Sequence, residues 1–131
     1  MKKHLCATAL ALSGLIFSPT LLAQAVQPSI SAGVAAKLSM RGDAPGFSVP
    51  EMRITRRGDY LSVQADVRNA GGDDLTLYYR FRWLDQVGNQ HGNGDAWKQL
   101  KLLSETQQTL KGTGPHPSVS DFRLELSFES Q

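Results

Sequence analysis

Apolar and polar residues alternate with a period of two along most of the chain after residue 48. The clearest runs are 61–67, 75–84 and 122–128, where nearly every second residue is apolar and most of its neighbours are polar or charged. This period is typical of strands with one buried face. Gly-, Asn- and Asp-rich segments at 69–74 and 85–95 predict loops between the runs. Because no segment repeats apolar residues at the helical period over three turns, we expect very little helix.

Several short strands separated by turns predict an all-β sandwich or barrel. Leu75–Leu84 is the most apolar run, so we expect it to be central, with Tyr60–Arg68 and Phe122–Phe128 as its partners. Two further strands are expected. One lies near 97–102, with a bulge where the alternation of apolar residues slips, and the other at 106–111.

The chain divides into three parts. Residues 1–25 predict a signal peptide, and residues 26–47, rich in Ser, Ala, Gly and Pro, predict a partly flexible lead-in. Within the lead-in, 34–40 is compatible with an edge strand or a short helical turn. The β-sandwich domain is expected over 48–131, and it opens with the alternation of Met52 and Ile54 with polar residues.

The first 25 residues have the three regions of a cleavable signal. Lys2 and Lys3 precede an apolar run over Leu5–Phe17, Pro19 breaks the run, and Ala23–Ala25 is a small-x-small cleavage pattern. The run is too short and too interrupted to span about 30 Å of hydrocarbon, so we expect cleavage after residue 25 and export to the periplasm. The alternative is an uncleaved N-terminal anchor.

Cleavage changes the charge and redox properties of the protein. The full chain of 131 residues carries 14 Lys+Arg, 12 Asp+Glu and one cysteine. Loss of residues 1–25 removes Lys2, Lys3 and Cys6, leaving 12 basic and 12 acidic residues and no cysteine. A net charge of zero gives no electrostatic footprint for nucleic acid. Because no cysteine follows the cleavage site, we expect neither a disulfide nor a lipid anchor.

The strand pattern and its flanking residues resemble a known family. The residues that carry the resemblance are Asn69, the segment Leu77–Asp85 (LYYRFRWLD), Gly88, Trp97, Ser118 and the segment Asp121–Leu126 (DFRLEL). They resemble the YcfL-like family of small bacterial envelope proteins of unknown function. The resemblance implies an immunoglobulin-like antiparallel β-sandwich in a single domain and a location in the Gram-negative envelope. Many members are lipoproteins, whereas this chain lacks the required cysteine. The family brings no catalytic residues.

One candidate site lies on the strand 75–84. Tyr78, Arg80 and Arg82 share the face opposite to its apolar residues, and an aromatic ring beside two guanidinium groups is typical of binding surfaces. They therefore form a possible partner-binding face. The alternative is a solvated face in which Asp66 or Glu125 on neighbouring strands neutralises the arginines.

A second candidate is the loop at 89–97, with His91, Asp95 and Trp97 as a possible ligand site for a glycan or an ion. The spacing of its polar residues is similar to that of a calcium loop, but the position that requires Glu is Leu100, and we expect no metal. The chain has no Gly-x-Ser-x-Gly elbow and no phosphate-binding glycine motif, so we expect no enzyme activity and no cofactor.

These observations together predict a non-catalytic accessory or binding module exported to the cell envelope. Its expected partner is another envelope protein, and no transmembrane segment is expected to remain after cleavage of the signal. The alternative function is binding of a small ligand, a glycan or an ion, through the loop at 89–97.

Overall fold

The computed structural model describes Gly14 and residues 32–130. The predicted signal peptide, apart from Gly14, and the first residues of the lead-in lie outside the described residues. One short helix, α1 (Ala32–Ala35), precedes the strands of the described chain. The strands are β1 (Leu38–Arg41), β2 (Phe47–Arg57), β3 (Tyr60–Asn69), β4 (Leu75–Leu84), β5 (Lys98–Leu102), β6 (Thr106–Thr113) and β7 (Asp121–Ser127).

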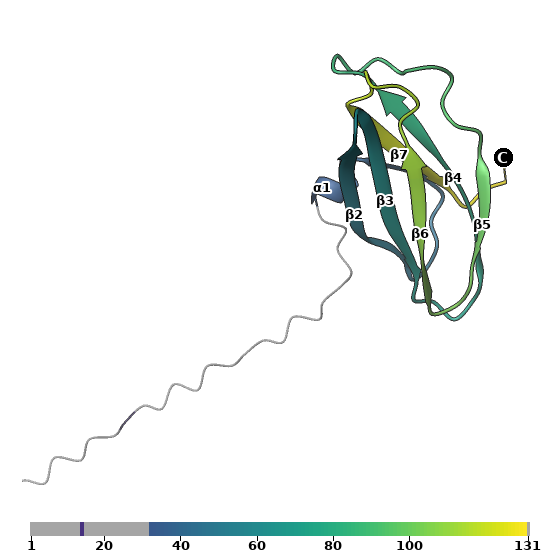
Figure 1. The fold of residues 1–131 in the computed structure, drawn as a ribbon. Helices are drawn as coiled ribbons and strands as arrows, with labels where there is room; N and C mark the ends of the chain where they lie inside the picture. The colour runs from purple at the N-terminus through teal and green to yellow at the C-terminus, as the bar shows by residue number, and fades with distance from the viewer. Residues whose placement is uncertain (1–13, 15–31, 131) are drawn as a thin grey trace, which may run out of the picture.

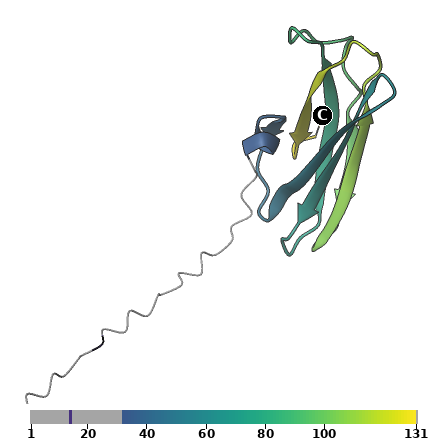
Figure 2. The same ribbon diagram turned by 60° about the vertical axis from the view of Figure 1, so that its left-hand side comes forward.

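The strands form two sheets packed face to face, which confirms the predicted β-sandwich (Figure 1). One sheet has the order β1-β7-β4-β5 and the other has the order β2-β3-β6. Figure 2 shows the two layers from the side. Neighbouring strands are antiparallel except β1 and β7, which run parallel at one edge. The antiparallel prediction therefore holds for every described pair but this one.

The core lies between the two sheets and follows the predicted alternation. In β3, every second residue from Leu61 to Val67 is buried, as a strand with one inward face requires. β4 and β7 supply an aromatic cluster to the same core. In this cluster the ring centroids of Phe81 and Trp83 are 5.2 Å apart, and that of Phe122 lies 6.3 Å from that of Trp83. Burial of such large apolar surfaces is the main contribution to stability.

The predicted neighbours of β4 are half right. β4 is central and pairs with β7, but its other neighbour is β5, whereas β3 is the central strand of the other sheet. Alternation determines which side chains of a strand face inward, but it is the same for strands of either sheet. The partner of a strand depends on where the loops cross between the layers.

Two local predictions are wrong. The bulge expected near 97–102 is absent, because β4 and β5 pair in regular register. Leu100 and Leu102 face the core, whereas Trp97 faces outward, so the alternation does not slip. The irregularity is instead in β2, between Ser48 and Glu51. Ile54, expected to be buried, lies opposite the buried Val63 but is itself 48% exposed, and β2 is an edge strand of its sheet.

The sandwich includes residues before 48. Both structures suggested for 34–40 occur in this region, since α1 ends at Ala35 and β1 begins at Leu38. Val34 and Leu38 pack against the core, and the backbone N–H of Leu124 donates to the carbonyl of Lys37. The end of the lead-in is therefore part of the folded domain. With four residues, α1, the helix among the described residues, is far too short to span a bilayer.

A glycine on β6 makes room for the aromatic cluster. A Cβ atom at Gly112 would lie 2.6 Å from Cδ2 and 2.7 Å from Cε2 of Phe81. No side chain fits at that distance without displacing the Phe81 ring, which is fully buried against Trp83. Gly112 thus fixes how closely β6 approaches β4 across the core.

Candidate functional site

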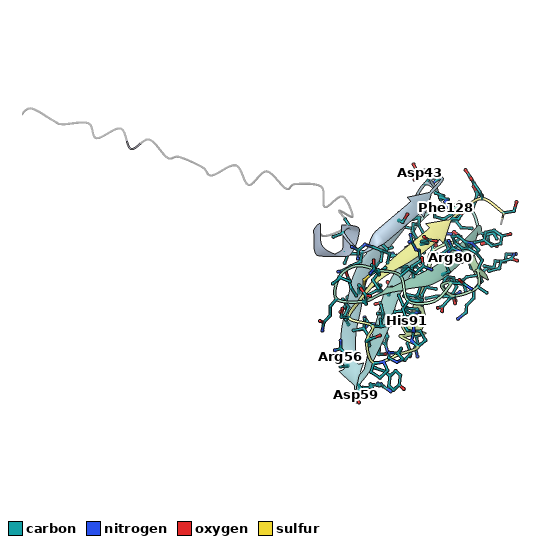
Figure 3. The ribbon with its side chains drawn as sticks, turned by 90° about the horizontal axis from the view of Figure 1, so that it is seen from above. Asp43, Arg56, Asp59, Arg80, His91 and Phe128 are labelled. Atoms are coloured by element: carbon teal, nitrogen blue, oxygen red, sulfur yellow. The ribbon has the colours of Figure 1, made fainter. Side chains whose placement is uncertain are left out.

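The predicted binding face exists as a continuous row on the outward side of the four-stranded sheet. Tyr78, Arg80 and Arg82 alternate with the buried residues of β4, and all three are partly exposed. The register with β7 places Arg80 opposite Glu125 and Arg82 opposite Arg123. Figure 3 shows Arg80 beside β7, with β2 on the far side of the sandwich.

Glu125 holds both arginines of the row. Its carboxylate forms an ion pair with Nε of Arg80 and a second, at 3.3 Å, with the guanidinium of Arg82. The Glu125 side chain is only 11% exposed, so its charge is stabilised mainly by these two partners. The sequence alternative in which Glu125 neutralises the arginines is therefore correct in its contacts. Asp66, the other suggested partner, is on β3 in the opposite sheet.

The loop at 89–97 lies against this same face. The Trp97 ring stacks on Arg80, with the guanidinium carbon 4.5 Å from the ring centroid. Gln90 accepts a hydrogen bond of 3.2 Å from Nε of Arg82. The two candidate sites of the sequence are thus adjacent in space. We call Tyr78, Arg80, Arg82 and Trp97 the candidate face.

The candidate face carries more positive than negative charge. Arg80 and Arg82 share the single carboxylate of Glu125, and nearby Lys37, just before β1, and Arg123 on β7 share that of Asp121. Within the described chain, four cationic side chains therefore surround two carboxylates. Arg82 and Arg123 also lie directly opposite each other, and like charges in that position repel. An anionic partner would relieve this repulsion.

The pKa of Asp121 reflects the same surplus of cations. Burial raises the pKa of its carboxyl group, but hydrogen bonds from Lys37, from the backbone N–H of Phe122 and from Arg123 lower it more. The net result is a pKa below the ordinary value of 3.8. Asp121 therefore remains ionised at neutral pH and fixes the position of Lys37 beside Arg123.

The remaining residues of the predicted ligand loop do not converge on one point. Asp95 accepts a hydrogen bond of 3.3 Å from Nε1 of the buried Trp83. His91 stacks on His116, with ring centroids 5.0 Å apart, and its backbone N–H donates to the carbonyl of Trp83. These contacts hold the loop along the C-terminal half of β4, beyond the residues of β4 that pair with β5. Among the described residues, no group of three His, Cys, Asp or Glu side chains is arranged to hold a metal ion.

A shallow hollow of about 370 Å³ lies at one end of the sandwich and contains none of the predicted site residues. It is lined by Asp85, Gln86, Val87 and Ser118. Oδ1 of Asp85 accepts hydrogen bonds from the backbone N–H groups of Val87 and Asn89, which fix the turn after β4. Ser118 forms hydrogen bonds with His116, two residues earlier in its own loop. The polar groups of the hollow thus hold the two loops in place.

Sequence reasoning missed a polar cluster on the outward side of the three-stranded sheet. Asp66 accepts two hydrogen bonds from Arg53 on β2, at 2.8 and 3.0 Å, and one from Thr109 on β6, at 2.7 Å. The bonds from Arg53 and Thr109 lower the pKa of Asp66 from 3.8 to about 2, against a smaller opposing effect of burial. This carboxylate links all three strands of the sheet. The polar residues that alternate with the buried ones in β3 are its only sequence signal.

Comparison with known proteins places the chain in a family. The family described as "Protein of unknown function (DUF1425)" matches residues 41–128, which is most of the domain. The chain belongs to this DUF1425 family. The match supports the expectation of a family of unknown function. The narrower resemblance to the YcfL-like family stays a prediction. None of the curated proteins matches the chain significantly.

Two solved structures share the fold. The crystal structure of Campylobacter jejuni cj0090 aligns with a TM-score of 0.62 and 18% identity, over 70% of this chain and 96% of that one. A DUF1425 family member from Shewanella sp. pv-4 aligns with a TM-score of 0.56 and 22% identity, over 66% of this chain and 84% of that one. At these identities the comparison shows the fold alone, which is the β-sandwich described above.

Proposed function

We propose that this DUF1425 protein is a non-catalytic binding module of the Gram-negative cell envelope, exported to the periplasm by residues 1–25. In this proposal its candidate face binds another envelope protein through an acidic surface of that partner. The observation that carries the proposal is the sharing of Glu125 by Arg80 and Arg82, with Trp97 stacked on Arg80.

The geometry of the candidate face suits recognition of carboxylates. Arginine binds a carboxylate through two parallel hydrogen bonds, and Arg80 and Arg82 together have more donors than Glu125 can accept. Stacking on Trp97 restricts Arg80 before any partner arrives, which lowers the entropy lost on binding. Tyr78 and Trp97 add flat contact area next to the charges, as is common at protein interfaces.

Charge balance favours a partner over a purely structural role. A structural ion pair needs one cation for each carboxylate, whereas here two cations share each one. Placing Arg82 opposite Arg123 costs stability in the free protein. An acidic partner would remove that cost, and the gain would appear as binding free energy.

The test compares three forms of the purified protein in cross-linking capture from envelope extracts. The face variant is Arg80→Ser with Arg82→Ser and Glu125→Gln, so that no buried carboxylate is left without its partners. The control is Arg68→Ser, an exposed arginine on the three-stranded sheet, because it changes the net charge by the same amount. We expect wild type and control to capture the same protein, and the face variant to lose it.

Each outcome is interpretable once melting temperatures show that all forms are folded. Capture should weaken as salt rises, because exposed charges about 10 Å apart are screened at 0.1 M salt. Retention of the partner by the face variant would refute the proposal. Equal loss in variant and control would assign the binding to overall charge. Loss with His91→Ala alone would favour the alternative ligand loop.

A further inference from the structure

The outer edge of β6 differs from the other three sheet edges of the described chain. Free strand edges pair readily with other strands, and proteins protect them with short strands, charges, prolines or bulges. β1 and β5 are short, with 4 and 5 residues, and β5 carries Lys98 and Lys101. β2 has an irregularity beside Pro50 and three arginines. β6 has eight residues, no proline and a single charge, Lys111.

The hydrogen-bond pattern shows which groups of β6 point away from its sheet. β6 pairs with β3 in unbroken register, and the backbone N–H of Gly114 donates to the carbonyl of Leu61 across the same ladder. Bonded pairs alternate along an antiparallel ladder, so the N–H and C=O groups of Gln107, Thr109 and Lys111 point off the free edge. In Figure 1, this edge lies on the side of β6 away from β3. All three residues are exposed.

From this geometry we propose that β6 pairs with β6 of a second copy of the chain, so that the two three-stranded sheets become one continuous antiparallel sheet. A two-fold axis through Thr109 gives about six backbone hydrogen bonds and sets each Lys111 opposite Gln107 of the other copy. The two Lys111 residues are then separated by four positions, about 13 Å along the strand. An axis through Lys111 would oppose the two lysines directly, and such pairs are destabilising.

Self-complementarity of this edge favours a second copy over a strand of another protein. In the proposed register Thr109 meets Thr109, and two β-branched side chains pack well against each other across a pair of strands. The Thr109 hydroxyl donates to Asp66 on β3, which ties β6 to its own sheet at the centre of the contact. The contact lies on the opposite sheet from the candidate face, so it leaves that face open in both copies.

Three substitutions at Gln107 test the proposal by sedimentation equilibrium of the purified protein over a wide concentration range. Gln107→Glu places an acid opposite Lys111 twice in each dimer, and Gln107→Lys places a lysine there. The dissociation constant of the dimer should fall for the first and rise for the second, by roughly 2- to 30-fold in each case. Gln107→Pro should abolish the dimer and leave the β3–β6 ladder intact, because the lost N–H points off the edge.

Two results would overturn the proposal. One is a monomer at every concentration up to about 1 mM, the range of very weak association. The other is a shift in the same direction for Gln107→Glu and Gln107→Lys, since opposite charges at one position must act oppositely if Lys111 faces it. Lys98→Glu on β5 serves as the control, because it changes charge at another edge and should leave the dissociation constant within about two-fold at moderate salt.

Discussion

Replacing Gly112 by Ala tests how closely the two sheets pack. The added Cβ would lie 2.6 Å from a carbon of the Phe81 ring, well inside ordinary contact distance. Phe81 is held between Trp83 and Phe122, with ring centroids at 5.2 and 6.2 Å, so it has no free space into which to move. Overpacking of this kind costs about 1–3 kcal/mol. Restricting the unfolded chain returns about 0.4–1 kcal/mol, so we expect a net loss of about 1–2 kcal/mol.

Urea denaturation of Gly112→Ala and a matched control measures this loss. The control is Gly72→Ala in the loop before β4, where an added Cβ meets no atom within 4 Å and the backbone is not left-handed. We expect the control to keep or slightly raise the free energy of unfolding, with the same m-value in both variants. Equal effects of the two substitutions would refute the argument. Adding Phe81→Leu should make Gly112→Ala less costly, by about 0.5 kcal/mol or more.

Three other predictions follow from burial, charge and the leader sequence. Trp83→Ala, at a side chain 1% exposed, should lower the free energy of unfolding by about 3–5 kcal/mol in urea denaturation, whereas Arg82→Ala on the outward face should lower it by under about 1 kcal/mol. Equal losses would contradict the inward orientation of Trp83. Because the fold lowers the pKa of Asp66 to about 2, its contribution should be complete above about pH 4 and vanish as the pH falls through 2. The free energy of unfolding of Asp66→Asn should therefore be about 1–2 kcal/mol lower than that of wild type at pH 7 and nearly equal to it at pH 2. A difference that does not change with pH would rule out the ion pair as its cause. The intact mass of protein extracted from the envelope should correspond to a chain that begins at Val26 without lipid, and a retained Met1 or an acyl increment would contradict this.

The alternation of side chains was sufficient to predict the strands and their inward faces. The pattern over Leu61–Val67 requires one buried face, and the structure buries it. The same pattern does not determine which strands are neighbours, so it places β3 beside β4 although β3 belongs to the other sheet. The pattern is also misleading at Trp97, because an outward aromatic residue looks like a break in the inward row.

The candidate face was predicted only in part, because its contacts depend on tertiary structure. The row of Tyr78, Arg80 and Arg82 follows from strand periodicity alone. The stacking of Trp97 on Arg80 does not, since it requires the loop at 89–97 to fold back along β4. The sequence therefore suggests two alternative sites, whereas the structure brings their residues together. The pairing of His91 with His116 joins residues from different loops, and no local pattern indicates it.

The most direct test of the central claim is site-specific photo-cross-linking in living cells. A photoreactive residue at Tyr78 probes the candidate face, and one at Tyr60, which is exposed at the start of β3, probes a surface outside it. If the face binds an envelope protein, the Tyr78 position should give a discrete adduct, and the adduct should disappear with Arg80→Ser, Arg82→Ser and Glu125→Gln. Position Tyr60 should give none. An adduct at Tyr60 but not at Tyr78, or one at Tyr78 that survives the loss of both arginines, would contradict the account.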